Sequence, residues 1–328
     1  MIRPKYILAL LCALLVVLFL AACTNGDDDP TPEVVYYTVS FDSQMGTEIA
    51  DMKVAAGKHI KEPVEPVRDG YVFDGWRLGG KEWLFETATV QSDITLTAKW
   101  IDAAQVFNYV PVEGGACITE AKREMNSIVI PSVINGLDVL AIAPHAFENP
   151  QNVDLLKIVI PESVVEIGDY AFAECENIVI EIRGSLTKLG EFAFYKCNLL
   201  KKVPFGEGIE QIPYGAFSGC ASLKEVRLPQ SLKVIGENAF EECSSLTSVM
   251  MHSTTASIED AAFRFCNKLA AIYYYGTQEQ FSQTVIANNG NDKFISANLC
   301  LYSATKPQNV SSGTWWYMDS NEKVKIWN

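Results

Sequence analysis

Alternating apolar and polar residues mark the first folded segment of the chain. Residues 37–41 and 94–100 both alternate with the period of two that half-buried β-strands show. Glycines and prolines divide the sequence between them into short pieces joined by turns. The pattern predicts a compact β module over residues 36–100. Large aromatic side chains supply the bulk of its core: Phe41, Tyr71, Phe73, Trp76, Trp83, Phe85 and Trp100.

A second pattern, with a period of about 23 residues, runs through most of the remaining chain. An Ala-Phe pair recurs six times, and successive phenylalanines are 25, 22, 23, 23 and 23 residues apart. Five of the pairs are followed three residues later by cysteine and six residues later by isoleucine or leucine. The phenylalanines are Phe147, Phe172, Phe194, Phe217, Phe240 and Phe263, and the cysteines are Cys175, Cys197, Cys220, Cys243 and Cys266.

One coil of this length cannot enclose its own apolar face, whereas stacked coils bury that face between them. The repeat therefore predicts a right-handed solenoid over residues 101–300, with one short parallel strand per coil. A solenoid end exposes apolar edges, so we expect residues 301–328 to form a C-terminal cap. Trp315, Trp316 and Tyr317 are assigned to this cap, with stacking on a sugar as the alternative.

Two sets of motifs resemble known bacterial repeat families. The unit Ala-Phe-x-x-Cys-x-x-Leu, followed by Val-x-Leu-Pro and Ile-Gly, closely resembles the BspA-type leucine-rich repeat. Gly-Tyr-Val-Phe-Asp-Gly-Trp at residues 70–76 and Thr-Leu-Thr-Ala-Lys-Trp at 95–100 resemble the Listeria–Bacteroides repeat. The resemblances imply an α/β leucine-rich-repeat solenoid preceded by a small β-grasp-like module, and a stalk or adhesive role. They also favour Tyr71 and Trp76 as core residues rather than a carbohydrate platform.

The N-terminal segment reads as an export signal. Arg3 and Lys5 precede an apolar run over residues 6–20, which is too short for a typical membrane-spanning helix. Leu-Ala-Ala-Cys at residues 20–23 resembles the lipobox of bacterial lipoproteins, which implies a signal peptide over 1–22 and a lipid on Cys23. An ordinary secretory signal with a chance cysteine is the alternative.

Residues 23–35 are polar, acidic and proline-containing, so we expect a flexible tether. The run resembles the acidic stretch of surface-exported lipoproteins of Bacteroidetes. That resemblance implies an outer membrane lipoprotein that faces the cell exterior and meets the membrane through its lipid. Protease shaving of intact cells tests this orientation.

Composition narrows the chemistry. The chain has 26 Lys and Arg against 40 Asp and Glu, a formal net charge of −14, and no basic cluster, which argues against a nucleic-acid partner. It has three histidines and lacks the Gly-x-Ser-x-Gly, His-Glu-x-x-His and phosphate-loop motifs. We therefore expect no catalytic residues, no metal site and no cofactor.

The repeat cysteines allow two interpretations. Regular cysteines in an exported protein can form a disulfide framework. Equivalent positions in stacked coils lie about 4.8 Å apart, farther than the roughly 3.5–4.5 Å between the Cβ atoms of a disulfide. We therefore predict a buried column of free thiols that act as small hydrophobic groups.

Recognition by the concave face is the remaining hypothesis. The residues between the buried positions of successive strands form a column that varies from coil to coil: Val159, Glu181, Pro204, Arg227, Met250 and Tyr273. Met250 and Tyr273 are the predicted ligand anchors, and their joint replacement by alanine is expected to leave stability nearly unchanged. A merely solvated column is the alternative. The sequence thus favours a non-enzymatic, adhesin-like surface protein that binds a protein ligand. The alternative is glycan capture for nutrition, with Tyr273 or Trp315 stacking on sugars.

Overall fold

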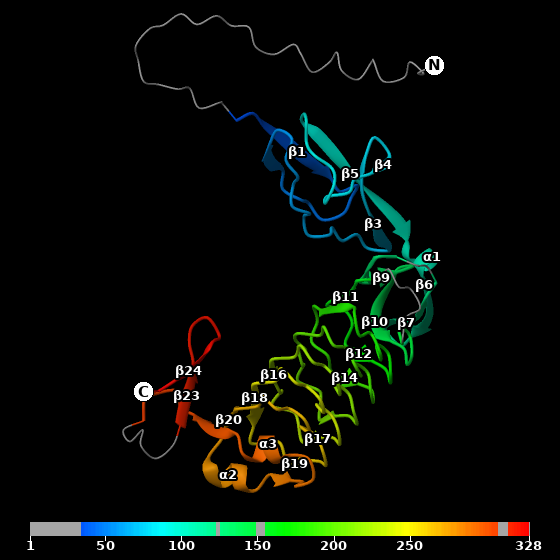
Figure 1. Cartoon of the computed structure of the whole chain (residues 1–328). Helices are drawn as coiled ribbons and strands as arrows, with labels where there is room; N and C mark the ends of the chain where they lie inside the picture. Colours follow the sequence, from blue (N-terminus) through cyan, green and yellow to red (C-terminus); the bar gives the residue numbers. More distant parts are fainter. Residues whose placement is uncertain (1–33, 123–124, 149–154, 308–313, 328) are drawn as a thin grey trace, which may run out of the picture.

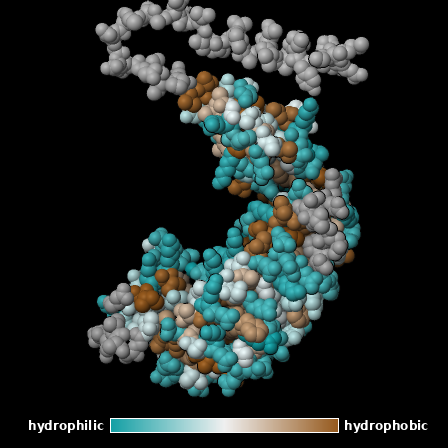
Figure 2. Space-filling model, viewed as in Figure 1, coloured by the Kyte–Doolittle hydropathy of each residue, from teal (hydrophilic) through white to brown (hydrophobic). Residues whose placement is uncertain are grey.

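The computed structural model describes residues 34–122, 125–148, 155–307 and 314–327. The predicted signal peptide, Cys23 and residues 24–33 of the tether lie outside the described residues. Figure 1 shows an arc that begins with the β module, continues through the stacked coils and ends in a C-terminal hairpin. Most of the visible surface is hydrophilic (Figure 2).

The β module is a five-stranded sheet with the order β2-β1-β5-β3-β4. Its strands are β1 (Tyr36–Asp42), β2 (Met52–Ala55), β3 (Tyr71–Leu78), β4 (Lys81–Glu82) and β5 (Ile94–Asp102). Strands β1 and β5 pair in parallel, and the other pairs are antiparallel. Trp76 is 2% exposed and packs edge-to-face on Phe41 and Phe73, at ring-centroid distances of 4.9 and 5.5 Å. The assignment of Trp76 to the core is confirmed.

The module packs directly on the first coils. Val72 and Ile101 belong to the same buried cluster as the solenoid core. The amide of Gly70 donates to the carbonyl oxygen of Val133 at 3.1 Å, and the Ser132 hydroxyl donates to Asp69 at 2.9 Å. The module therefore covers the N-terminal end of the solenoid. The first solenoid elements are α1 (Ala103–Val106), β6 (Phe107–Val112) and β7 (Gly115–Ala121).

Stacked coils follow, as the period predicts, and most of them contribute two short strands rather than one. The strands on the inner side of the arc are β8 (Ser127–Val129), β11 (Lys157–Ile160), β13 (Val179–Ile182), β16 (Glu225–Arg227), β18 (Ser248–His252), β20 (Ala271–Tyr275) and β22 (Asn298–Tyr302) (Figure 1). The outer strands after β7 are β10 (Leu137–Ile142), β12 (Glu166–Ile167), β14 (Lys188–Leu189), β15 (Gln211–Ile212), β17 (Val234–Ile235), β19 (Ser257–Ile258) and β21 (Val285–Ile286). A short strand β9 (Val133–Ile134) pairs with β10.

The Ile-Gly part of the repeat has a steric reason. A Cβ atom on Gly190 would lie 2.3 Å from the backbone nitrogen of Asp169 in the preceding coil. The glycine thus lets adjacent coils approach closely enough to pair, and its amide donates to the carbonyl oxygen of Ile167 at 2.8 Å.

The inner and the outer β-sheet of the solenoid are both interrupted at the same coil. On the inner side β13 and β16 belong to separate sheets, and on the outer side so do β14 and β15. Pro204 occupies the inner strand position of this coil, and Pro213 occupies the position that Gly190 and Gly236 hold in neighbouring coils. Proline has no amide hydrogen, so the coil cannot donate a ladder hydrogen bond at either place.

The core consists of repeated columns of identical side chains. The phenylalanine rings stack along the solenoid with centroid distances of 5.2–5.6 Å and interplanar angles of 4–9°. The five repeat cysteines form the predicted buried column, and all seven cysteines in the described residues are free thiols. Each repeat thiol also donates a hydrogen bond to a phenylalanine carbonyl oxygen of the preceding coil.

The C-terminal end of the core is closed by local structure. The last elements are α2 (Gln278–Ser282), α3 (Asp292–Ile295), β23 (Thr314–Met318) and β24 (Val324–Ile326). Phe294 in α3 stacks on Phe263 at 4.6 Å and ends the ring column. The buried Asn291 side chain accepts from the Phe263 amide at 3.0 Å and donates to the carbonyl oxygens of Glu259 and Ala287 at 2.8 Å. The Asn291 side chain thus makes the hydrogen bonds that a further coil would otherwise make with the last one.

Candidate functional site

The inner strands bring the predicted binding residues into one column. Val159 pairs in register with Glu181, while Arg227, Met250 and Tyr273 are successive partners across β16, β18 and β20. Pro204 lies at the break between these two stretches. The alignment of these positions, inferred from the repeat, is therefore correct on both sides of the break.

The members of this column differ in solvent exposure, and two that were expected to be solvent-accessible are buried. Val159 is 0% exposed and Met250 is 7% exposed, so neither is the solvated residue that the sequence predicted. The side chains of Glu181 and Arg227 are 46% and 39% exposed. Tyr273 is partly buried. Only part of the column can meet a ligand without rearrangement.

The chain's own C-terminus covers the predicted anchors. Strand β23 pairs in parallel with β22, and β24 turns back antiparallel to β23. Trp316 of β23 is fully buried in one cluster with Met250 and Cys300, and its ring centroid lies 5.5 Å from that of Tyr273. The sugar-stacking alternative is therefore wrong for Trp316, whose ring belongs to the cap.

The tip of this hairpin reaches three strands across the concave face. The Arg227 guanidinium donates to the carbonyl oxygen of Glu322 at 3.2 Å. Asp319 holds the turn by accepting from the amides of Asn321 and Lys323, both at 2.9 Å. Sequence reasoning missed this contact; the one local signal is the polar turn between two short aromatic and apolar segments.

An aromatic set beside the column also escaped sequence reasoning. His252 stacks on Tyr275 with ring centroids 4.5 Å apart, and Tyr275 in turn contacts Tyr302 and Trp316 at 4.8 and 4.7 Å. Burial lowers the pKa of His252, an effect that the nearby Glu207 carboxylate partly offsets. Because its pKa is lowered, His252 is neutral at pH 7, and its ring packs against aromatic rings.

The open section of the concave face lies between the β module and the hairpin and carries charges of both signs. Glu181 forms ion pairs with Lys157 at 3.6 Å and Arg183 at 3.2 Å, and Glu225 pairs with Arg227 at 3.4 Å. Exposed pairs of this kind contribute about 0–1 kcal/mol to stability. These side chains are therefore free to exchange partners with a ligand at small cost.

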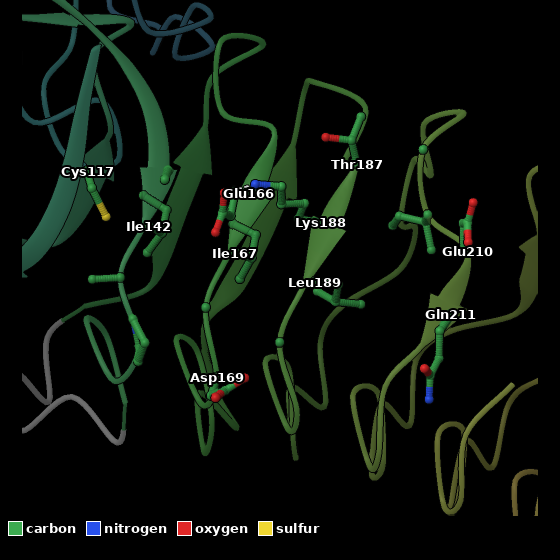
Figure 3. Close-up of a pocket in the computed structure, with 17 residues that line it drawn as sticks. Cys117, Ile142, Glu166, Ile167, Asp169, Thr187, Lys188, Leu189, Glu210 and Gln211 are labelled. Atoms are coloured by element: carbon green, nitrogen blue, oxygen red, sulfur yellow. Dashed lines mark hydrogen bonds and ion pairs between the residues drawn. The ribbon is translucent and has the colours of Figure 1, made fainter. Parts of the chain in front are cut away.

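The outer strands form a second concavity, of about 520 Å³, shown in Figure 3. Its lining includes Cys117, Ala141, Glu166, Lys188 and Gln211. Glu166 and Lys188 lie on neighbouring strands and pair at 3.1 Å (Figure 3). Burial raises the pKa of the Cys117 thiol, and the Glu166 carboxylate raises it further, so the thiol stays protonated at neutral pH. A protonated thiol is a poor nucleophile.

The described residues contain no group of three or more histidine, cysteine, aspartate or glutamate side chains placed to hold a metal ion. Among the same residues no helix has the length and apolar character needed to cross a membrane.

Comparison with known protein families assigns both halves of the arc. Residues 140–270 and 187–298 match the BspA type leucine rich repeat region, in six copies. Residues 37–99 match the Listeria-Bacteroides repeat domain.

Individual relatives share only parts of the chain. A membrane-protein-like sequence of Evansella cellulosilytica is 35% identical over 100 residues, which are 30% of this chain and 15% of that protein. Internalin H of Listeria monocytogenes is 37% identical over 68 residues, 20% of this chain and 12% of that protein. The chain thus spans a small fraction of the length of these relatives.

One solved structure shares the solenoid fold, and a second is similar in sequence. A leucine rich cell surface protein from Faecalibacterium prausnitzii aligns with a TM-score of 0.51 at 23% identity, covering 68% of this chain and 59% of the other. A leucine-rich repeat protein of T. pallidum is 33% identical over 52% of this chain and 79% of its own, with a TM-score of 0.47. Over residues 140–298 the chain belongs to the BspA-type leucine-rich repeat family, and over residues 37–99 it is a Listeria-Bacteroides repeat domain.

Proposed function

We propose that this protein is a non-enzymatic, adhesin-like binding protein of the cell surface that holds a protein ligand in the open section of its concave face. One contrast between the two sides of the inner strands carries the proposal. The inward positions repeat as isoleucine or valine and are at most 5% exposed: Ile158, Ile180, Val226, Val249 and Ile272. The outward positions beside them change in size and charge from coil to coil. Packing therefore constrains the whole inward side, whereas on the outward side Val159 and Met250 are buried and Glu181 and Arg227 stay exposed and available for recognition.

The chemistry of the open section favours a protein ligand over a glycan. Its exposed side chains are charged, with both signs interleaved across β11, β13 and β16. Charged rims of this kind steer and select protein partners. The aromatic rings that could stack on a sugar, such as Tyr273, lie under or beside the C-terminal hairpin.

The anchor is a second part of this proposal. A lipid on Cys23 would join the membrane to the folded arc through the acidic tether, with the β module nearest the membrane and the coils farther out. A Cys23→Ser variant is expected to lose metabolic labelling with palmitate and to leave the membrane fraction. Retention of the label on the variant would contradict the anchor, and protease shaving of intact cells tests whether the protein faces outward.

The concave face is tested with a charge-reversal pair. The full-length protein is first screened by surface plasmon resonance against immobilised extracellular-matrix proteins and bacterial surface extracts, with and without periodate treatment. Binding to a target that survives periodate is expected to fall at least tenfold in a Glu181→Arg/Glu225→Arg variant. Arg227 is kept, so the hairpin contact with Glu322 is preserved.

The matched control reverses two carboxylates that line the second concavity, Glu166→Arg and Glu210→Arg, which changes net charge equally. That variant is expected to bind within about twofold of the unmodified protein. Equal losses in both variants would indicate a general charge effect, and unchanged binding in the first variant would show that another surface is used. Both results would contradict the proposal.

A further inference from the structure

A groove of about 520 Å³ crosses the turns that follow the stacked phenylalanines, away from the concave strands. We call it the turn groove. Small-ligand sites commonly have volumes of roughly 300–1,000 Å³, so its size fits a ligand of a few rings. Six of the residues that line it are Asn198, Gly219, Ala221, Glu242, Ser244 and Phe265.

The hollow arises from a local change in side-chain size. The position two residues after the repeat phenylalanine has a positive φ angle in the five coils where it is described, and it is Lys196, Gly219, Glu242 and Phe265 in four successive coils. In the second of these coils Gly219 has no side chain, and Ala221, two residues on, has only a methyl group. The longer side chains of Lys196 and Glu242 therefore stand on either side of a depression.

Phe265 is unfavourable for stability on two counts. Its φ angle is +60°, a backbone conformation in which a residue with a Cβ atom costs about 1–2 kcal/mol. Its side chain is 54% exposed, so the ring gains little from burial. Glycine occupies the equivalent position two coils earlier without this penalty. Glu174, Lys196 and Glu242 have the same positive φ, so the backbone cost is common to this position of the repeat. What distinguishes Phe265 is its exposed aromatic ring, which a stacking role would explain.

The Phe265 ring has one cationic neighbour. The Arg264 guanidinium carbon lies 5.5 Å from the centroid of the Phe265 ring. Glu241 in turn fixes that guanidinium, accepting from Arg264 Nε at 2.6 Å. This contact favours one orientation of the Phe265 side chain at the groove, and such preorganisation lowers the entropy cost of binding.

Polar side chains around the ring have spare hydrogen-bonding capacity. Asn198, Ser244 and Asn267 line the groove, and within the described part of the chain their side chains make no hydrogen bond. Together they offer amide donors, amide acceptors and a hydroxyl. Glu176 and Glu242 add carboxylates at the same surface.

We propose that the turn groove binds a neutral pyranose oligosaccharide. The C–H face of a sugar ring would stack on Phe265, and its hydroxyl groups would pair with the Asn198, Ser244 and Glu242 side chains. The two carboxylates of the lining, on Glu176 and Glu242, outnumber its one lysine, Lys196, so sulfated or sialylated chains would be disfavoured. An apolar ligand would find only Phe265 and Ala221 to cover it. This site is separate from the concave face, so it stands or falls independently of the protein-binding proposal.

The test is a glycan array that carries neutral hexose oligosaccharides together with sialylated and sulfated forms of the same chains. The full-length protein is expected to bind neutral chains selectively. The neutral oligosaccharide with the strongest signal is then titrated by calorimetry against Phe265→Ala and against Ala221→Gln, which fills the hollow. Each variant is expected to lose at least about tenfold in affinity, equivalent to 1.4 kcal/mol.

Two more variants separate binding from folding. Phe265→Gly relieves the backbone penalty, so its Tm is expected to stay the same or rise by about 1–3 °C while binding is lost. Tyr214→Ala removes an exposed aromatic ring outside the groove and is expected to bind normally. The proposal is overturned if no neutral chain binds, if only anionic chains bind, or if the Phe265 and Ala221 variants bind like the unmodified protein.

Discussion

The Sγ atom of Cys220 donates a hydrogen bond to the carbonyl oxygen of Phe194 in the preceding coil, at a distance of 3.2 Å. The same relationship recurs at every repeat cysteine, with distances from 3.0 to 3.3 Å. The Phe194 oxygen also accepts the Cys197 amide at 3.1 Å, so it joins the turn of its own coil to the next coil. The cysteine is therefore both a small buried group and a link between coils.

Replacing one such thiol tests this link. Cys220→Ala removes the donor and leaves a small cavity in a fully buried site, so we expect the free energy of unfolding to fall by about 1–2 kcal/mol. Cys117→Ala, at a half-exposed thiol, is the control and is expected to change it by less than about 0.5 kcal/mol. Urea titration followed by circular dichroism measures both, and equal effects would contradict a special role for the column.

The buried thiols also predict a loss of stability in alkali. Burial raises the pKa of Cys197, Cys220 and Cys243 above the ordinary value near 9. Above about pH 9 the unfolded chain releases protons that the folded chain keeps, so the free energy of unfolding falls as pH rises. Each thiol contributes up to about 1.4 kcal/mol per pH unit.

Urea midpoints at pH 8, 9.5 and 10.5 measure this loss. The Cys220→Ala variant is expected to lose stability less steeply than the unmodified protein, because one of the linked protons is gone. Tyrosine ionisation acts on both proteins alike, so the difference between the two slopes isolates the thiol. Parallel curves for the two proteins would argue against the linkage.

The hairpin over the concave face changes what Met250 is expected to do. Met250 is buried with Cys300 and Trp316, so Met250→Ala should cost about 2–4 kcal/mol rather than leave stability unchanged. Trp316→Ala should cost about 3–5 kcal/mol and expose β22. Hydrogen exchange would locate the loss at β20, β22 and β23. Uniform protection in both variants would mean that the hairpin does not pack as described.

The Asn291 side chain predicts where the solenoid begins to unfold. Asn291→Ala leaves the Phe263 amide and the Ala287 carbonyl oxygen without their side-chain partner and removes one of the two donors to the Glu259 oxygen, so we expect a loss of about 2–4 kcal/mol. Exchange should accelerate first in the last coils, since each coil is stabilised by its neighbours. Asn288→Ala, an exposed asparagine nearby, is the control, and similar exchange in both variants would refute the capping role.

The parts of this fold that can be predicted from the sequence are those that follow the 23-residue repeat. The Ala-Phe and cysteine positions predict the ring column and the thiol column because equivalent side chains in stacked coils must meet their own copies. The same rule aligned Arg227, Met250 and Tyr273 in one row. The break in both ladders is also readable in principle, since Pro204 and Pro213 lack the amide hydrogen that the ladder needs.

Contacts between the solenoid and the non-repetitive segments at its two ends cannot be predicted in this way. Nothing in the spacing predicts that Trp316 buries Met250, or that Arg227 reaches the carbonyl of Glu322, because 95 residues separate the two ends of that hydrogen bond. The packing of Val72 and Ile101 on the first coils is equally non-repetitive. The turn groove depends on which coil carries Gly219 and which carries Phe265, and its depth exists only when those coils are stacked.

The sequence by itself therefore determined the period, the stacked core and the identity of the side chains on each row. The tertiary structure alone decided which members of the concave column meet water, because the C-terminal hairpin folds back over the last strands of the solenoid. Local spacing specifies neighbours one coil apart, whereas the contacts of the β module and of the C-terminal hairpin depend on packing between segments far apart in sequence. The hairpin buries Met250 and partly covers Tyr273, and the charged section of the concave face stays open.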